Sequence, residues 1–325
     1  MALIEAENLN KKFKIYSRGE GITGYLKSFV SRNYDEVNAV EDLDLEIEKG
    51  NMVGYIGANG AGKSTTVKML TGILEPTSGR IEVDGRNPNK ERKKNAMNIG
   101  VVFGQKTQLW WDLPVKESFK LLKDIYEVSD KDYEARIDEF DEVLQLSDFW
   151  DQPVRKLSLG QKMRCELAAA FLHHPKIVYL DEPTIGLDVA VKERIRDFIR
   201  KMNEERNITV ILTTHDIGDI EDLCESIVVL DEGRKIYDGT LNELVNKFTS
   251  RRIILETEDI IELEIEGVDE VENIKNGKTE VLFDSEKISA SELMKKVLEK
   301  YDVSDFQIKE PDIEMVVKKI YNEGI

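Results

Sequence analysis

The sequence predicts an α/β fold organised around a glycine-rich loop, with an antiparallel β subdomain, an α-helical subdomain and a small C-terminal α+β domain. Residues 52–72 read as an apolar strand, a glycine-rich loop and a helix. Apolar strands at 176–180 and 208–214 alternate with helical patterns, as in a parallel sheet. After Ser250 short alternating strands prevail, so we expect two domains, residues 1–248 and 249–325.

Composition limits the classes of partner. The chain has 325 residues, a net charge of -18 and a pI near 4.8, so no basic stripe is available to neutralise nucleic acid, and we expect no nucleic-acid partner. The sequence shows no secretory signal and no uncharged apolar run of about 18 residues. It therefore predicts a chain that is neither secreted nor membrane-spanning. Cys165 and Cys224 lack metal-ligand spacing and are expected to be free buried thiols in a reducing compartment.

The N-terminal region predicts a small antiparallel sheet. Residues 2–15 and 40–47 both alternate apolar and polar side chains. Between them, residues 16–37 contain a helically spaced group, which is Tyr25, Leu26, Phe29 and Val30. Two interpretations stay open for this group: a surface helix that covers part of the sheet, or a docking arm for a partner or a membrane surface.

The glycine-rich loop GANGAGKS, from Gly57 to Ser64, carries the first chemistry. Its glycines permit a tight turn whose backbone N–H groups converge on phosphate oxygens, and the following helix adds its positive N-terminal end. Lys63 would reach the β- and γ-phosphates, and the Ser64 hydroxyl would ligate Mg²⁺. The spacing predicts phosphate binding, since an ordinary glycine-rich turn would not need a lysine at its end.

Residues 78–111 predict a hairpin, a core strand and an apolar loop. The hairpin turns at Asp84-Gly85, and the buried strand 98–104 ends at Gln105, where a polar side chain could touch the metal and the attacking water. Leu109, Trp110 and Trp111 follow. They either fill the core of a helical subdomain or present an exposed anchor for another protein.

A second anion site is predicted beyond two acidic amphipathic helices at 115–149. Leu157 to Gln161 reads as a loop that opens a long helix, so Ser158 and the Gly160 amide lie at the positive end of that helix. His173 and His174 close the same helix, where a cation suits the dipole.

Two parallel strands end in residues suited to catalysis. Asp181, at the carboxyl end of the first strand, is positioned to hold Mg²⁺ through water, and Glu182 lies where a general base for water is needed. His215 ends the second strand at the same edge and is expected to donate to the γ-phosphate. Adjacent acids in this setting favour catalysis over solvated strand ends.

Six motifs together resemble the nucleotide-binding subunit of ATP-binding cassette (ABC) transporters. They are GANGAGKST, Gln105, LSLGQ, YLDEPT, Gly186 to Asp188 and His215, in the family's order and spacing over about residues 3–247. The stretches FGQKTQLWWDLP and IYDGTLNEL are similar to a bacterial subfamily whose permeases are separate ABC-2-type membrane proteins, often exporters of drugs or other amphipathic compounds. Leu159 stands where the best-known signature has glycine. Because Ser158 and Gly160 supply the phosphate contacts, function is expected to survive.

The resemblance implies a P-loop NTPase fold, the cofactors ATP and Mg²⁺, and hydrolysis of ATP by two chains that face each other head to tail. Each ATP would lie between the P-loop of one chain and the LSLGQ loop of the other. Phe13 matches the aromatic that stacks on adenine, and Asp188 would couple the two sites. The implied catalytic residues are Glu182, His215, Gln105 and Lys63, and the implied metal ligands are Ser64, Gln105 and Asp181. The implied nucleotide-binding residues are Phe13, Asn59, Gly60, Ala61, Gly62, Lys63, Ser64, Thr65, Ser158, Gly160 and Asp188.

The implied partners are integral ABC-2-type permease subunits and a second ATPase subunit, identical to the first in a homodimer, on the cytoplasmic face of the cell membrane. A non-transport ABC ATPase is the alternative. Translation-type members carry two ATPase units in one chain, and repair-type members insert a long coiled coil that the interval from Ser64 to Asp181 cannot hold. A module that binds ATP without cleaving it is disfavoured by Glu182 and His215. The sequence contains no pocket that would identify a cargo.

The remaining sequence predicts a terminal hairpin turning at Gly233, a helix at 241–248 and the α+β domain. Strands are expected at 252–256, 261–266, 279–284 and 303–308, with a hairpin at Asn276-Gly277, a helix that a capping box from Ser289 to Glu292 begins, and a last helix after Pro311. The domain resembles the C-terminal extension of the same subfamily. Dimer support, regulation and passive capping of a surface all remain open.

Overall fold

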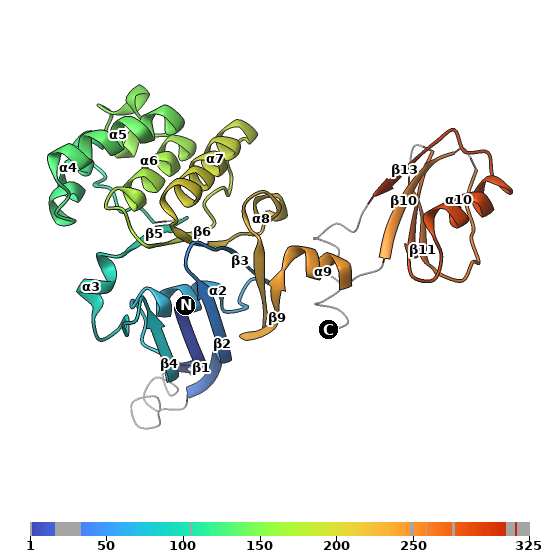
Figure 1. The fold of residues 1–325 in the computed structure, drawn as a ribbon, viewed down its shortest axis with the longest axis horizontal. Coiled ribbons are helices and arrows are strands. Elements are labelled where there is room, and N and C mark those ends of the chain that lie inside the picture. The colour runs from blue at the N-terminus through green and yellow to red at the C-terminus, as the bar shows by residue number, and fades with distance from the viewer. Residues whose placement is uncertain are drawn as a thin grey trace, which may run out of the picture. The chain divides into compact units, whose positions relative to one another are not determined.

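The computed structural model of the chain describes residues 2–16, 34–104, 106–247, 250–257, 259–274, 277–309 and 316. The chain divides into two compact units at Asp238 and Gly239 (Figure 1). The predicted boundary at residue 248 lies after α9 (Leu241–Lys247), the predicted short helix, which belongs to the second unit. The predicted helical segment between the first two strands, Gln105, and the last helix apart from Val316 lie outside the described residues.

The first unit is built on a six-stranded sheet with the order β5-β6-β7-β3-β8-β9. The strands from β5 to β8 are parallel. All residues of β7 are buried, as expected for a strand with helices on both faces. The two predicted apolar strands are thus confirmed as neighbours β6 and β7, and the P-loop strand β3 lies beside β7. The bounds are β3 (Met52–Gly57), β5 (Ile99–Phe103), β6 (Ile177–Asp181), β7 (Thr209–Thr213), β8 (Ser226–Asp231) and β9 (Arg234–Thr240).

An antiparallel sheet of β1 (Ala2–Tyr16), β2 (Tyr34–Glu48) and β4 (Ser78–Val83) confirms the predicted N-terminal sheet. The turn at Asp84 and Gly85 is also confirmed, with φ of 51° and 69°. Its second arm is only an isolated bridge from Val83 to Arg86, because β4 pairs with β1 instead.

One hydrophobic cluster joins the antiparallel sheet to the P-loop unit. Leu9 and Leu43 of the antiparallel sheet are fully buried in the same cluster as Tyr55 of β3 and Val67 of α2 (Lys63–Leu70). Removing these side chains from water stabilises both sheets against the P-loop helix, at about 1.5–3 kcal/mol for each large side chain. The phosphate-binding loop is therefore anchored from two directions.

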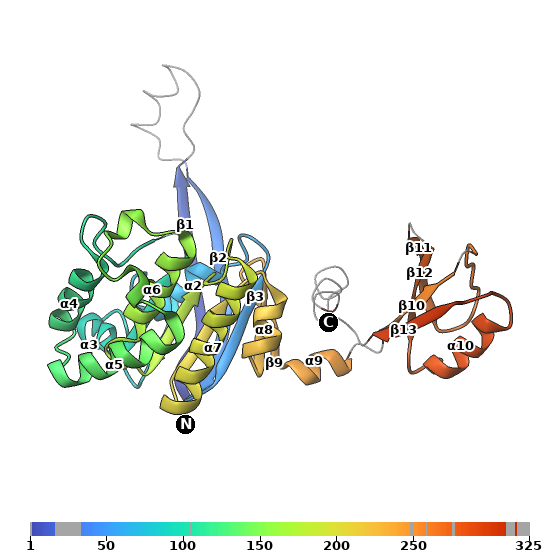
Figure 2. The same cartoon turned by 90° about the horizontal axis from the view of Figure 1, so that it is seen from above.

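The predicted α-helical subdomain is formed by α4, α5 and α6, which follow β5 and are grouped in one part of the unit in both views (Figures 1 and 2). Ser129 caps α5 by accepting a hydrogen bond of 3.1 Å from the Asp132 N–H. The helices of the unit besides α2 are α3 (Arg92–Ala96), α4 (Val115–Ile125), α5 (Asp130–Leu144), α6 (Leu159–Phe171), α7 (Val189–Arg206) and α8 (Ile217–Leu223), with 3-10 turns at Ser147–Phe149 and Val154–Lys156.

The end of α6 corrects one expectation. The helix stops at Phe171, and the His173 ring stacks on Tyr126 with centroids 3.9 Å apart while its Nε2 lies 3.0 Å from the Ile99 carbonyl oxygen. Burial lowers the pKa of His173 to about 4, so the ring is neutral at pH 7. The prediction that it acts as a cation at the helix end is wrong.

In the residues that the structure describes, the second unit contains a four-stranded antiparallel sheet, ordered β11-β12-β10-β13, whose core includes side chains of the nine-residue helix α10. Ser289 caps that helix by accepting a hydrogen bond from the Glu292 N–H, which is one of the two bonds of the predicted capping box. The predicted strand 261–266 is wrong: this stretch is irregular, and Val268–Ile274 pairs with β12 in its place. The bounds are β10 (Ser250–Glu256), β11 (Val268–Ile274), β12 (Lys278–Asp284), α10 (Ala290–Leu298) and β13 (Asp305–Lys309).

Candidate functional site

The loop between β3 and α2 requires glycine where the sequence supplies it. Gly60 and Gly62 have φ of +89° and +101°, in the left-handed region that other residues rarely adopt. A Cβ atom on Gly62 would lie 2.5 Å from the Ala39 carbonyl oxygen. The chain can therefore turn sharply here and enter α2 with its first N–H groups free, which is the geometry of an anion site at a helix N-terminus.

Lys63 lies at the start of α2 and folds back over the loop. Its Nζ donates hydrogen bonds to the Gly57 oxygen at 2.5 Å and the Ala58 oxygen at 3.1 Å. Burial lowers the pKa of Lys63, and the charges of Glu182 and Asp181 act in the opposite direction. These two carboxylates keep a cation at the mouth of the loop, where phosphate would be bound.

Ser64 and Asp181 place oxygen ligands next to this cation. The Ser64 hydroxyl lies 3.2 and 3.4 Å from the two Asp181 carboxylate oxygens, and the Thr213 hydroxyl donates to Asp181 Oδ1 at 2.5 Å. Magnesium in phosphate sites takes one or two protein oxygens and completes its shell with phosphate and water. The pair fits that requirement. Among the described residues no cluster of three or more His, Cys, Asp and Glu side chains offers a richer metal site.

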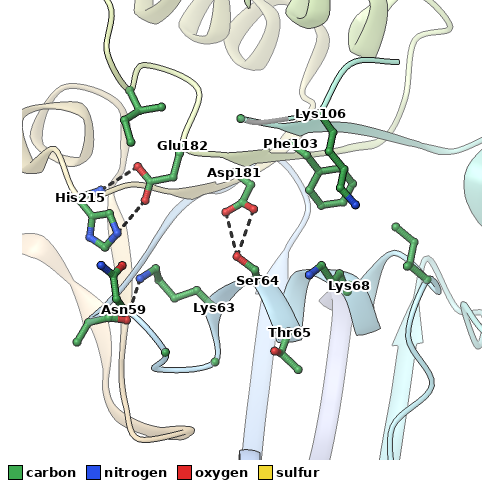
Figure 3. A pocket seen from close by; sticks show the side chains of 16 residues that line it. Asn59, Lys63, Ser64, Thr65, Lys68, Phe103, Lys106, Asp181, Glu182 and His215 are labelled. Atoms are coloured by element: carbon green, nitrogen blue, oxygen red, sulfur yellow. Dashed lines mark hydrogen bonds and ion pairs between the residues drawn. The ribbon is translucent and has the colours of Figure 1, made fainter. Parts of the chain in front are cut away.

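Glu182 and His215 form a pair on the other side of the pocket. The His215 Nε2 lies 3.2 Å from Glu182 Oε1, and the His215 N–H lies 3.4 Å from Glu182 Oε2 (Figure 3). Glu182 has φ of 57°, an uncommon conformation that turns its carboxylate away from Asp181. Burial raises the pKa of Glu182, while His215 and Lys63 lower it. A carboxylate with a raised pKa suits a general base better than an ordinary one.

These residues line one cavity of about 570 Å³, a size typical of small-molecule sites. It brings together nine of the predicted residues, which are Asn59, Gly60, Gly62, Lys63, Ser64, Thr65, Asp181, Glu182 and His215. It also contains residues that sequence reasoning missed, which are Ala58, Lys68, Ile73, Phe103, Gly104, Lys106 and Ile185. Lys68 could have been found, because it lies four positions after Ser64 on one helix face.

Other predicted residues lie outside the cavity. Phe13 is 39% exposed, with the Lys11 Nζ 5.3 Å from its ring centroid. Ala61 is buried. Asp188 caps α7 by accepting a hydrogen bond of 3.0 Å from the Val191 N–H. Gln105 is outside the described residues.

Ser158 and Gly160 lie at the start of α6, as predicted. The Ser158 oxygen accepts from the Gln161 N–H at 3.2 Å, and the Gln161 side chain accepts from the Ser158 N–H at 2.9 Å, which forms a capping box. The expected loop from Leu157 to Gln161 is shorter than predicted, since α6 already begins at Leu159. Leu159 is 49% exposed at this helix end, separate from the cavity. The chain therefore carries two anion-seeking helix ends that it does not join in one pocket.

A buried acid supports the loop that bears Glu182. Asp219 of α8 is fully buried and accepts hydrogen bonds from Thr184, which follows Glu182, and from Thr214, which precedes His215. The Arg196 side chain of α7 pairs with Asp219 at 2.7 Å. This acid thus ties the positions of Glu182 and His215 to one another.

The apolar loop after β5 divides into a buried and an exposed part. Leu109 is buried, but Trp110 and Trp111 are 38% and 53% exposed, and the Lys162 Nζ lies 5.4 Å from the centroid of the Trp111 ring. Glu166 of α6 fixes this loop by accepting hydrogen bonds from Thr107 and the Gln108 N–H. The two tryptophans are therefore not core residues.

Comparison with families and with solved structures agrees with this geometry. Residues 40–185 match the family described as ABC transporter, and residues 239–315 match the family described as ATP-binding protein DrrA1-3-like, C-terminal domain. A solved dimeric structure of an ATP-binding cassette in a post-hydrolysis state, bound to ADP and Pi, matches at a TM-score of 0.61 and 28% identity, covering 73% of this chain and 98% of that chain. Among the described residues no helix is long and apolar enough to cross a bilayer.

Three curated relatives show how far the likeness extends. The ABC transporter ATP-binding protein NatA of Bacillus subtilis is 35% identical over 64% of this chain and 84% of its own length. The methionine import ATP-binding protein MetN 2 of Enterococcus faecalis is 30% identical over 93% of this chain and 85% of its own length. The daunorubicin resistance ATP-binding protein DrrA3 of Streptomyces coeruleorubidus is 35% identical over 66% of this chain and 67% of its own length.

Proposed function

Since the chain belongs to the ABC transporter family and is an ATP-hydrolysing subunit of a transporter, we propose that it powers a separate ABC-2-type membrane permease that exports an amphipathic or drug-like compound. The observation that carries this proposal is the DrrA1-3-like C-terminal unit at residues 239–315. The name of the relative DrrA3 refers to resistance to daunorubicin, an effect that removal of the drug would produce. The relative MetN 2 is named for import, so a transport assay that distinguishes export from import tests this part of the proposal.

The proposed reaction centre uses the cavity beside the P-loop. Lys63 and the N–H groups from Gly60 to Thr65 bind the β- and γ-phosphates of ATP, and Ser64 with Asp181 would hold Mg²⁺, which neutralises phosphate charge when bound. Glu182 takes a proton from the attacking water, and His215 orients Glu182 and donates to the γ-phosphate. Gln105, which follows β5, contributes to the metal and water sites.

The second half of each site is proposed to come from another copy of the chain. The Ser158 hydroxyl and the Gly160 N–H at the start of α6 would bind the γ-phosphate held by the facing P-loop. Phe13, which is 39% exposed on β1, would stack on adenine, and Asp188 would couple the two sites across the interface. This arrangement explains why one chain presents two anion sites in separate places.

Glu182→Gln tests the assignment of the base. The amide cannot accept the proton, so ATP hydrolysis is expected to fall by at least about a hundredfold while ATP still binds. Phosphate release and calorimetry with Mg²⁺ and ATP measure the two properties. The control Glu193→Gln changes an exposed acid on α7 and should hydrolyse ATP at the wild-type rate. Wild-type turnover in Glu182→Gln would refute the assignment.

The permease contact is proposed to include Trp110 and Trp111, whose exposure favours an anchor over a core role. Changing both to alanine should abolish co-purification of an integral membrane protein from detergent-solubilised membranes and spare basal ATPase activity. Ile125→Ala, which removes an apolar side chain that is 55% exposed on α4, serves as the matched control. Undiminished co-purification of the double variant would exclude the anchor. If the double variant loses the circular dichroism signal of a folded protein, the core interpretation is favoured instead.

A further inference from the structure

The outer edge of β13 is a surface that the ATPase site does not use. All five residues of β13 are exposed, including Phe306 at 46% and Ile308 at 45%. In the sheet that the described residues form, β13 is the last strand beyond β10, and no described strand pairs with its other side. An exposed edge with apolar side chains is a template for another strand.

The backbone of β13 shows which groups face outward. The Phe306 N–H donates a hydrogen bond of 2.8 Å to Oδ1 of the preceding residue, Asp305, so it is not engaged by β10. In an antiparallel pair the residues whose N–H and C=O groups point to one neighbour alternate with those that point to the other. The amides of Phe306 and Ile308 therefore face the free edge, and those of residues 305, 307 and 309 face β10.

We propose that β13 pairs antiparallel with β13 of a second copy of this chain, about a two-fold axis at Gln307. In that register Phe306 of each copy lies opposite Ile308 of the other, and the outward amides of these residues form reciprocal hydrogen bonds. Asp305 of each copy then lies opposite Lys309 of the other, so opposite charges meet at both ends of the pair. The five-residue strand is complementary to itself, as an isologous interface requires.

An apolar groove beside β13 would add side-chain surface to the proposed contact. Met294 and Leu298 of α10 line a cavity of about 800 Å³ together with Phe306 and Ile308. Ile253 pairs with Ile308 and Leu255 with Phe306, so these side chains of β13 lie on the face of the sheet that carries the core of the unit. Pairing of two copies would place the same side chains of the second copy over this groove, which removes exposed apolar surface from water.

The other edge of the sheet contrasts with β13. Asp269, Glu270 and Glu272 make β11 acidic along its length. Antiparallel pairing of two such strands would place like charges opposite one another, which is a common protection against edge-to-edge association. The charge pattern thus selects β13 as the self-pairing edge.

Pairing through β13 needs no nucleotide. If two ATPase units close on ATP as proposed above, a permanent contact between the second units would raise the effective concentration of one ATPase unit near the other. This consequence depends on the proposed function, but the contact itself does not. The β13 contact and the proposed function can therefore be refuted separately.

Sedimentation velocity of the full chain without nucleotide tests the contact. The wild type should be a dimer. Lys309→Asp should raise the dissociation constant of the dimer at least tenfold, because two aspartates then face each other at each end of the pair. The double change Asp305→Lys with Lys309→Asp should restore it. Lys300→Asp carries the same charge change on the turn after α10 and should leave the dimer intact. A monomeric wild type, or a dimer that Lys309→Asp does not weaken, would overturn the proposal.

Two backbone-level variants give an independent answer. Ile308→Pro removes an outward N–H that β10 does not use, so the variant should stay folded and lose the dimer. Gln307→Cys places two thiols across the axis, where Cα atoms of an antiparallel pair approach to about 4.5 Å, within disulfide range. Mild oxidation should then give covalent dimers, since Cys165 and Cys224 are buried. If the folded Gln307→Cys variant forms no covalent dimer on mild oxidation, the register is contradicted.

Discussion

Asp181 and Glu182 are adjacent in sequence but face different surroundings. Asp181 ends β6 and accepts hydrogen bonds from the Ser64 and Thr213 hydroxyls. Glu182 turns away with a positive φ, and burial raises its pKa. Two neighbouring carboxylates thus face different surroundings, which suits the separate roles proposed for them, a metal ligand for Asp181 and a base for Glu182. The pairing with His215 keeps the second carboxylate directed into the cavity.

The buried ring of His173 predicts a pH dependence of stability. Its pKa is about 4 in the folded chain, against about 6.5 for an ordinary histidine, so between these values the unfolded state binds more protons. Stability is therefore lost as pH falls below 6.5, by about 2 kcal/mol at pH 5. His173→Gln cannot titrate. The difference between its unfolding free energies at pH 7 and pH 5, measured by urea denaturation, should be smaller than that of the wild type by this amount. An equal pH dependence in both proteins would contradict the neutral buried ring.

At the scale of elements, α7 and α8 hold the turn that carries Glu182. Arg196 of α7 pairs with two acids of α8, the fully buried Asp219 at 2.7 Å and Asp222, whose side chain is 47% exposed. The buried acid also binds the hydroxyls of Thr184 and Thr214. One arginine therefore offers a direct comparison between a buried and an exposed partner.

Replacing each acid separately measures this difference. Asp219→Ala should lower the unfolding free energy by about 3–5 kcal/mol, because Arg196 and both threonines lose a buried partner. Asp222→Ala should cost less than about 1 kcal/mol, since the lost pair is in contact with solvent. Urea unfolding of the two variants gives both values. Similar losses would show that Asp219 does not hold the turn.

Elements with strong local signals were predictable from sequence. The P-loop strand, the parallel strands β6 and β7, and the capped helices α6 and α10 occur as the pattern indicates. Residues 261–266 were not predictable, because Ile261, Leu263 and Ile265 do pack on the core of the unit, as in a strand, yet the hydrogen-bonding position beside β12 belongs to β11. Alternation reports which side chains point inward and does not identify the pairing partner.

The cavity was predictable only in part. Its polar residues follow from motifs, but the lining by Ile73 and Ile185 depends on how loops meet around the P-loop. The state of Trp110 and Trp111 also had to come from the structure, because apolar side chains on a loop carry no periodicity that would distinguish core from surface. Residue type alone left both interpretations open.

At the scale of the whole molecule, we propose that two copies of the chain complete each ATP site. The P-loop cavity and the start of α6 are separate in one chain, and each has the geometry of an anion site. Two ATP molecules held between two chains would satisfy both sites at once. Hydrolysis would then remove the charge that holds the chains together, which links chemistry to a change in assembly.

Cross-linking between two variants that each carry one added cysteine tests this claim most directly, since the native Cys165 and Cys224 are buried. Asn59→Cys marks the P-loop and Leu159→Cys marks the start of α6, both at exposed positions, and each chain also carries Glu182→Gln to prevent hydrolysis. A short bismaleimide should join the two chains when Mg²⁺ and ATP are added, and should not join them without nucleotide or link two copies of either variant alone. Equal cross-linking with and without ATP, or none with ATP bound, would contradict the shared site.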